Sequence, residues 1–141
     1  MKALLKMSVL ALAMVVMTGC ASNGGSGGGV KDSDVIAGIV SDMLAALGDQ
    51  DIEKMMSSYS EDFESDQGGD LAATKDFLTS AKEGGLLDGL EVDQSAMETT
   101  ITGDTAEVGP VDLEGSFGSM TLEFDLEKRD GTWVVVYMAQ Y

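Results

Sequence analysis

The apolar residues of the chain fall into two regions with different periods. Between residues 32 and 90 they recur at three- and four-residue steps, which is the spacing of one face of an α-helix. This pattern predicts three amphipathic helices, over residues 32–48, 49–63 and 70–83. Each starts at Asp or Ser, and Gly follows or ends the first and the third. The apolar face of the first helix consists of Val35, Ile36, Ile39, Val40, Met43, Leu44 and Leu47.

Beyond residue 91 the period changes to two, which is typical of β-strands that bury one face. The alternation predicts strands over residues 92–102, 105–114, 120–127 and 132–139. Gly109-Pro110 interrupts the alternation of the second strand, so a bulge or an edge irregularity is expected there. The last strand has apolar residues at both parities, which indicates that both of its faces are covered, in a central or a curled-over position.

The order of these elements predicts an α+β fold. Three N-terminal helices pack on one face of a curved antiparallel sheet of about four strands. The strongest local signal in the sheet is Asp130-Gly131, which favours a tight hairpin turn between the last two strands. A chain of 141 residues is long enough for one domain with an ordinary core.

The composition narrows the functions that such a fold can serve. The chain has 25 Asp and Glu against 8 Lys and Arg, and this net charge of −17 opposes binding to nucleic-acid phosphates or anionic lipid headgroups. It contains no His, which excludes Ser-His and Cys-His nucleophile pairs and His-ligated metals. A single Cys excludes an intramolecular disulfide. We therefore expect no nucleic-acid partner, no metal and no cofactor.

The first 19 residues have the layout of an export signal. Lys2 and Lys6 precede a nearly unbroken apolar run over residues 7–17, and small residues follow directly before Cys20. The run is too short to cross a bilayer, which takes about 20 apolar residues. The stretch Val16-Met17-Thr18-Gly19-Cys20 resembles the signal of bacterial lipoproteins, with Met in place of the usual Leu. This resemblance implies that a diacylglyceryl group is attached to Cys20, which becomes the mature N-terminus.

The same resemblance implies a location and a domain plan. In such lipoproteins the residue after the lipidated Cys directs sorting, and Ala21 rather than Asp indicates the outer membrane. Residues 21–29 are Gly, Ser, Asn and Ala, which build no core and predict a flexible tether. The predicted plan is a signal peptide (1–19), the lipidated Cys20 with its tether (20–31), and a periplasm-facing domain (32–141). The lipid on Cys20 is the expected contact with the membrane, because two or more acyl chains hold a protein stably.

Three stretches of the folded part resemble the nuclear transport factor 2-like, or cystatin-like, superfamily. They are residues 47–63, which end in Tyr59-Ser60-Glu61-Asp62-Phe63, residues 74–78 and residues 130–135. The likeness covers residues 32–141. It implies a cone-shaped domain with a cavity between sheet and helices, and it implies no particular reaction, since one fold hosts many functions.

The resemblance allows one catalytic arrangement to be tested on the residues. Members of the ketosteroid isomerase type use a Tyr sixteen residues before the Tyr of the second helix and an Asp base eight residues after it. Counted from Tyr59, these positions hold Met43 and Gln67, which have neither the acidic hydroxyl nor the basic carboxylate.

Two classes of function, and one mode of assembly, remain open. The leading expectation is a non-catalytic envelope lipoprotein that binds a small apolar molecule or a partner protein. The alternative is a small isomerase, dehydratase or cyclase of the same fold that uses a carboxylate base, with Asp66 or Glu64 as the candidate. A homodimer formed through the sheet would show an exposed apolar patch on the outer face of the last strands.

Several side chains are candidates for the lining of the cavity. We expect Tyr59, Asp66, Trp133 and Tyr137 there, since Tyr and Trp combine an apolar body with a polar tip. The acidic runs at 49–53 and 62–66 lack the Gly and Glu that an EF-hand calcium loop requires. A group of methionines is expected either to line an adaptable pocket or to fill the core: Met43, Met55, Met56, Met97, Met120 and Met138.

The lipid anchor is tested by Cys20→Ala, which removes the thiol that would form the thioether. We expect the variant to remain an unprocessed and unlipidated precursor, as read by intact mass and by recovery of the membrane fraction. Normal processing together with normal membrane recovery would contradict the anchor.

Overall fold

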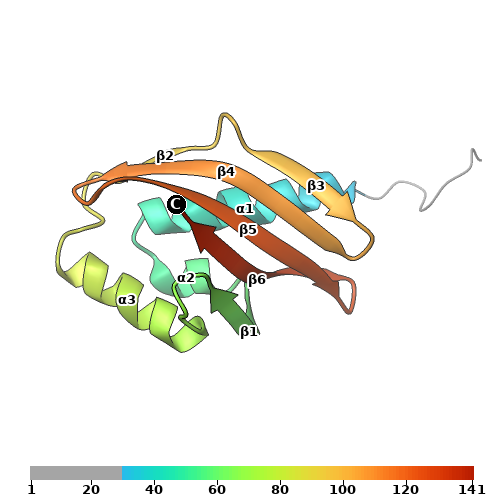
Figure 1. Cartoon of the computed structure of the whole chain (residues 1–141), viewed down its shortest axis with the longest axis horizontal. Helices are drawn as coiled ribbons and strands as arrows, with labels where there is room; N and C mark the ends of the chain where they lie inside the picture. The colour runs from blue at the N-terminus through green and yellow to red at the C-terminus, as the bar shows by residue number, and fades with distance from the viewer. Residues whose placement is uncertain (1–29) are drawn as a thin grey trace, which may run out of the picture.

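The computed structural model of the chain describes residues 30–141, so Cys20 and the signal-like segment lie outside the described part. Residues 30–141 form three helices and six strands around one sheet (Figure 1). In chain order these elements are α1 (Asp32–Gly48), α2 (Ile52–Met56), β1 (Tyr59–Ser65), α3 (Leu71–Glu83), β2 (Glu91–Asp93), β3 (Glu98–Thr102), β4 (Thr105–Gly115), β5 (Gly118–Arg129) and β6 (Thr132–Gln140).

The sheet has the strand order β1-β6-β5-β4-β2, and β3 also pairs with β4. All pairs are antiparallel except β1 with β6, which is parallel. The prediction of a central last strand is confirmed, since β6 lies between β1 and β5. The predicted α+β fold with a curved sheet is confirmed as well, with six strands where about four were expected.

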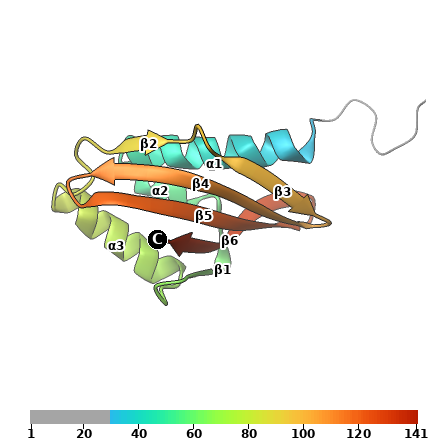
Figure 2. The ribbon, with the colours of Figure 1, turned by 45° about the horizontal axis from the view of Figure 1, so that its top comes forward.

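Helix α1 lies lengthwise along one face of the sheet (Figure 2). Its predicted bounds and apolar face are confirmed: Ile36, Val40, Met43, Leu44 and Leu47 are buried. The predicted N-cap is wrong, because Lys31 occupies that position without a side-chain cap. The Asp32 carboxylate accepts hydrogen bonds from Lys128 Nζ instead, at 3.1 and 3.0 Å.

The predicted second helix is wrong beyond Met56. The helix ends there, and Tyr59 begins strand β1. Tyr59 and Phe63 are four residues apart, which fits a helix, and they also share parity, which fits one face of a strand. Pairing with β6 decides in favour of the strand, because it supplies backbone hydrogen bonds between residues 59–65 and β6. The two rings pack edge to face, with centroids 4.6 Å apart.

The strand predicted over residues 92–102 is two strands, β2 and β3, which both pair with β4. A turn separates them, in which Asp93 Oδ1 accepts from Ser95 N at 2.8 Å. This local side-chain hydrogen bond competes with continued pairing and breaks the strand. The irregularity predicted at Gly109-Pro110 is confirmed as a register shift between Val108 and Val111.

The core lies between α1, α2 and the inner face of the sheet. Alternate residues of β4 and β5 point into it, and the Asp130-Gly131 turn, with φ of 52° and 80°, keeps β5 and β6 in register. A bulge between Asp125 and Leu126 shifts the inward parity of β6 from Val135 to Met138. The largest side chains that are almost fully buried are Phe63, Phe124, Ile36, Met43, Leu44 and Leu126.

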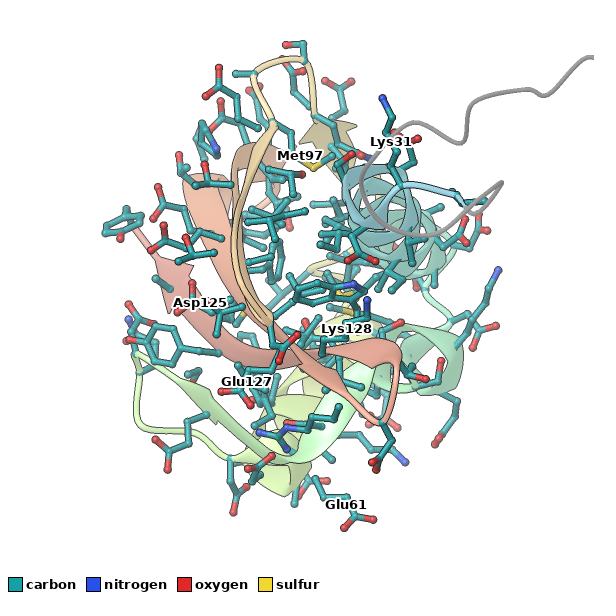
Figure 3. The ribbon with its side chains drawn as sticks, turned by 90° about the vertical axis from the view of Figure 1, so that its right-hand side faces the viewer. Lys31, Glu61, Met97, Asp125, Glu127 and Lys128 are labelled. Carbon is teal, nitrogen blue, oxygen red and sulfur yellow. The ribbon has the colours of Figure 1, made fainter. Side chains whose placement is uncertain are left out.

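Two ion pairs, which we call clasps, join different elements at the end of the sheet where the chain enters the domain. Lys128 lies between the β5–β6 hairpin and α1 (Figure 3), with its Nζ 5.8 Å from the ring centroid of Trp133. The hydrogen bond from Lys128 is the main cause that lowers the pKa of Asp32. The indole N–H of Trp133 lies nearby, outside hydrogen-bond geometry, and lowers the pKa of Asp32 further. Arg129 forms the second clasp, a bidentate pair with Asp62 of β1 at 2.6 and 3.1 Å.

The Arg129–Asp62 pair predicts a pH-dependent contribution to stability. Hydrogen bonds from Arg129 are the main cause that lowers the pKa of Asp62 to about 2 from its ordinary 3.8, and the Ser60 hydroxyl lowers it further from nearby, outside hydrogen-bond geometry. The stabilisation is therefore complete well above pH 4 and is lost as pH falls towards 2. We expect Asp62→Asn to unfold more easily than the parent chain at pH 6, and the difference to shrink as pH falls through about 2.

Urea denaturation at a series of pH values measures this effect. Glu61→Gln is the matched control, since it removes the same charge one residue away and Glu61 makes no ion pair within residues 30–141. An Asp62→Asn effect that does not change with pH would show that the clasp does not depend on the charge of Asp62.

Candidate functional site

A cavity of about 470 Å³ lies between α3, the ends of α1 and α2, and the inner face of the sheet. This volume is within the range of small-molecule sites. The β4–β5 turn and the end of α3, which contribute to its lining, lie at the end of the domain opposite to the entry of the chain (Figure 2). Its lining consists of Leu47, Met55, Tyr59, Ser65, Gln67, Gly69, Ala73, Thr74, Phe77, Leu78, Ala81, Leu86, Leu87, Leu90, Leu113, Phe117, Met120, Leu122, Met138 and Gln140.

The exposure of the lining residues separates a floor from a mouth. Leu47 and Met55 are 3% and 2% exposed and belong to the floor. Phe77 on α3, Leu86 in the following turn and Phe117 in the β4–β5 turn are 65%, 42% and 36% exposed and form the mouth. Single exposed apolar side chains are common on protein surfaces. Several large ones gathered at one opening are unusual and often mark a binding site.

Helix α3 is held over this cavity from both sides. On the inner side, Leu78 and Ala81 are buried against the core. On the outer side, Lys75 pairs with Glu53 of α2 at 2.6 Å, and Lys82 Nζ donates to the Gln50 backbone carbonyl at 2.8 Å. The predicted cap of the helix is confirmed, since Asp70 Oδ1 accepts from Ala73 N at 2.8 Å.

Tyr59 is a buried polar residue that borders the cavity. Its side chain is 7% exposed, it lines the cavity, and its hydroxyl has no hydrogen-bond partner within the described chain. Burial alone raises the pKa of this phenol well above its usual range, so the group is neutral and keeps its proton. The hydroxyl itself has almost no accessible surface and so does not open onto the cavity, and a buried hydroxyl without a partner costs about 1–3 kcal/mol.

The remaining polar groups of the lining are also neutral. They are the hydroxyls of Ser65 and Thr74, both nearly buried, and the amides of Gln67 and Gln140. The lining contains no Asp, Glu, Lys, Arg, His or Cys. Within residues 30–141, no three such acidic, His or Cys side chains are grouped to hold a metal, and no helix is long and apolar enough to cross a bilayer.

Of the four side chains expected in the lining, the structure places Tyr59 there and the other three elsewhere. Trp133 is buried beside Lys128 at the opposite end of the sheet. Tyr137 pairs with Asp125 on the outer face, because the bulge in β6 changes the parity of that strand. Asp66 follows the inward-facing Ser65, points outward and accepts from Gln140 N at 3.1 Å.

The structure divides the methionines between the two expected roles. Met55, Met120 and Met138 line the cavity, whereas Met43 and Met56 belong to the buried core. Met97 is half-buried and packs against the core from the turn between β2 and β3.

The sequence reasoning missed Ser65, Thr74 and Phe117. Thr74 had a readable signal, since it precedes Leu78 by four residues on the apolar face of α3. Phe117 is an aromatic residue among the small residues of a hairpin turn, which is another readable signal. Ser65 had none, because its role follows from a strand that the local pattern did not predict.

Comparison with known proteins adds the fold to these observations. No protein-family model and no curated protein matches the sequence. Among solved structures, a protein of unknown function with a cystatin-like fold from Nostoc punctiforme superimposes with a TM-score of 0.63 at 13% identity, over 77% of this chain and 89% of its own. The chain has the nuclear transport factor 2-like, or cystatin-like, fold.

Two further bacterial structures agree with this fold. A nuclear transport factor 2-like protein of unknown function from Shewanella baltica matches with a TM-score of 0.62 at 17% identity, over 77% of this chain and 90% of its own. A cystatin-like protein from Caulobacter vibrioides matches with a TM-score of 0.63 at 14% identity, over 76% and 86%. Identities this low establish the architecture and leave the function to the site.

The unpartnered hydroxyl of Tyr59 predicts an unusual mutant. Tyr59→Phe removes a buried polar group that makes no hydrogen bond within the described chain, so we expect the ligand-free variant to be as stable as the parent or more stable by up to about 1 kcal/mol. Thermal and urea unfolding measure this, with Tyr137→Phe as the matched control outside the cavity. A loss of more than about 1 kcal/mol would show that the hydroxyl is already paired, for example with a buried water.

Proposed function

We propose that this protein is a lipid-anchored envelope protein that binds a small, neutral, largely apolar molecule in the cavity under α3. The observation that carries the binding function is an apolar cavity of about 470 Å³ whose few polar lining side chains are all neutral. A cavity lined by apolar side chains with few oriented polar groups is the usual form of a small-molecule site.

The electrostatics of the cavity favour a neutral ligand. A charge that enters an apolar cavity without a partner loses its hydration, and the lining offers no opposite charge to replace it. The net charge of −17 opposes anions in addition. An apolar body therefore supplies the affinity, and neutral oxygen or nitrogen atoms supply the orientation.

The envelope location rests on the sequence. Cys20 follows an export-like segment, and the Gly- and Ser-rich residues after it precede α1 directly. The cavity lies at the other end of α1, a helix of 17 residues that is about 25 Å long at 1.5 Å per residue. An anchor at Cys20 thus leaves the mouth accessible to the periplasm.

The rival function, an isomerase or cyclase of the same fold, needs a base that reaches the ligand. The candidate Asp66 points away from the cavity and accepts a backbone hydrogen bond from Gln140. Met43, at the position of the oxyanion donor, is buried in the core. Because the lining has no carboxylate, the geometry supports binding over acid-base catalysis.

A matched pair of fluorescent probes tests the proposed binding. N-Phenyl-1-naphthylamine and 8-anilinonaphthalene-1-sulfonate share one aromatic scaffold and differ by a sulfonate. We expect the neutral probe to bind with a one-to-one stoichiometry and enhanced fluorescence, and the anionic probe to bind at least about 10-fold more weakly. The preference should persist in 1 M NaCl, where a Debye length of about 3 Å removes long-range repulsion.

Variants with a charge in the lining locate the site. We expect Met138→Lys to weaken binding of the neutral probe at least about 10-fold, because the substitution places an ammonium group in the apolar wall of the cavity. Met97→Lys is the control, since Met97 is also half-buried but lies outside the lining. Met120→Lys repeats the test from another strand if Met138→Lys fails to fold by circular dichroism. Absence of saturable binding, or equal effects of the cavity and control variants, would overturn the proposal.

A further inference from the structure

The mouth of the cavity exposes three large apolar side chains that come from three separate segments. Phe77 lies on α3, Leu86 in the turn after it and Phe117 in the β4–β5 turn. All three line the cavity and are also exposed to solvent. The end of α3 and the β4–β5 turn lie at the same end of the domain (Figure 2). Separate contacts hold each of the three segments in place.

Leu86 is fixed by the way in which α3 ends. Gly85, with φ of 74°, follows the helix in a Schellman motif, and its N–H donates to the Lys82 carbonyl at 3.0 Å. Leu86 N donates to the Ala81 carbonyl at 2.8 Å in the same motif. The Leu86 carbonyl accepts from Ser116 Oγ at 3.2 Å. This last hydrogen bond joins the turn after α3 to the β4–β5 turn, so the two sides of the mouth are linked.

The ring of Phe117 lies against the backbone of Gly115. An ideal Cβ built on Gly115 would lie 2.7 Å from Phe117 Cε1 and 3.2 Å from Phe117 Cζ, and the first distance is shorter than real Cβ contacts. Gly115 pairs with Gly118 across the turn, so the ring lies over the end of the β4–β5 hairpin. Because only a residue without a side chain leaves room for it, Gly115 fixes the position of the ring.

Phe77 is positioned by the attachments of α3. Leu78 and Ala81 are buried on the inner side of the helix. The ion pair of Lys75 and the hydrogen bond of Lys82 hold its outer side. Phe77 therefore stays at the opening in the ligand-free protein, and the mouth is formed before a ligand arrives. Such preorganisation reduces the cost of ordering the side chains on binding.

The continuity of the mouth with the cavity shows what can cover it. Because Phe77, Leu86 and Phe117 also line the cavity, a ligand chain that leaves the cavity passes over them. A ligand that fits wholly inside would leave their exposed apolar surface in water. The lining itself consists largely of leucines and methionines, and methionine side chains adapt to a flexible partner.

We propose that the mouth is a second apolar subsite, and that the ligand is an uncharged amphiphile whose single aliphatic chain is longer than the cavity. The inner part of the chain occupies the cavity, and the next part lies against Phe77, Leu86 and Phe117. The polar head group stays in water beyond them, and the net charge of −17 opposes an anionic head group. This inference rests on the proposed function, because it specifies the ligand of the same cavity.

A chain-length series tests the second subsite. The probes are saturated 1-monoacylglycerols from hexanoyl to tetradecanoyl, each below its critical micelle concentration. Their affinities are measured by displacement of N-phenyl-1-naphthylamine. Each methylene that leaves water should tighten binding by up to about four-fold. In the parent chain we expect this gain to continue to the longest member of the series, because the mouth receives the part of the chain that the cavity does not.

Two single substitutions alter the mouth and leave the floor of the cavity intact. Phe77→Ser removes an exposed apolar side chain, and Gly115→Ala adds a methyl group that displaces the Phe117 ring. We expect each to weaken the tetradecanoyl probe about 10-fold. Binding of the hexanoyl probe and of N-phenyl-1-naphthylamine should change by no more than about two-fold.

Each of these variants has a matched control outside the lining. Val35→Ser also removes an exposed apolar side chain from a helix, and Gly38→Ala adds a Cβ that meets nothing within 4 Å. Both controls should bind the whole series as the parent does. Phe117→Ser replaces Gly115→Ala in the test if the latter fails to fold by circular dichroism.

The outcomes separate this inference from the proposed function. If the mouth variants weaken short and long chains equally, or leave the long chains unaffected, the second subsite is wrong and the apolar site stands. If sedimentation equilibrium shows a ligand-free dimer that Phe77→Ser dissociates, a second copy covers the mouth and the inference is wrong as well. If the neutral probe does not bind in the cavity at all, the proposed function falls and this inference falls with it.

Discussion

The site depends on a mismatch of length between a helix and the sheet that it covers. Helix α1 has 17 residues and extends about 25 Å, whereas β5 has 12 residues and extends about 40 Å. The helix buries the sheet from the entry of the chain to Leu47, and the remaining part of the sheet needs another cover. Helix α3 supplies it as a second, separately held layer, and the space that side chains leave unfilled between the two covers is the cavity.

The charges and the cavity are segregated by the alternation of the strands. Glu107, Glu123 and Asp125 lie on the outer face of β4 and β5, where burial and the two neighbouring carboxylates raise the pKa of Asp125. The intervening residues point inward and are apolar. One backbone register thus produces an acidic exterior and a neutral interior. In a dimer formed through the sheet, this acidic face would contact the same face of the second copy. Such a dimer stays a prediction, and it would need these carboxylates to be screened or protonated.

Local signals predicted the elements that local interactions define. The apolar stripes of α1 and α3, the Asp70 cap, the Gly109-Pro110 irregularity and the Asp130-Gly131 turn are all readable within a few residues. Strand β1 was not predictable in this way, because Tyr59 and Phe63 fit both periods and the strand that pairs with β1, β6, lies more than seventy residues away. Tyr59 borders the cavity, and the parity of the unpredicted strand is the reason that Ser65 faces inward and Asp66 does not.

The Asp32–Lys128 pair has a consequence for force. A tether pulled from residue 31 loads the first turn of α1, where the carboxylate of Asp32 is fastened to the β5–β6 hairpin. The load therefore passes into the antiparallel β5–β6 ladder at its hairpin end. Helix α3 and the β4–β5 turn lie outside this path, so under the proposed anchorage a pull on the chain strains the attachment end and not the opening of the cavity.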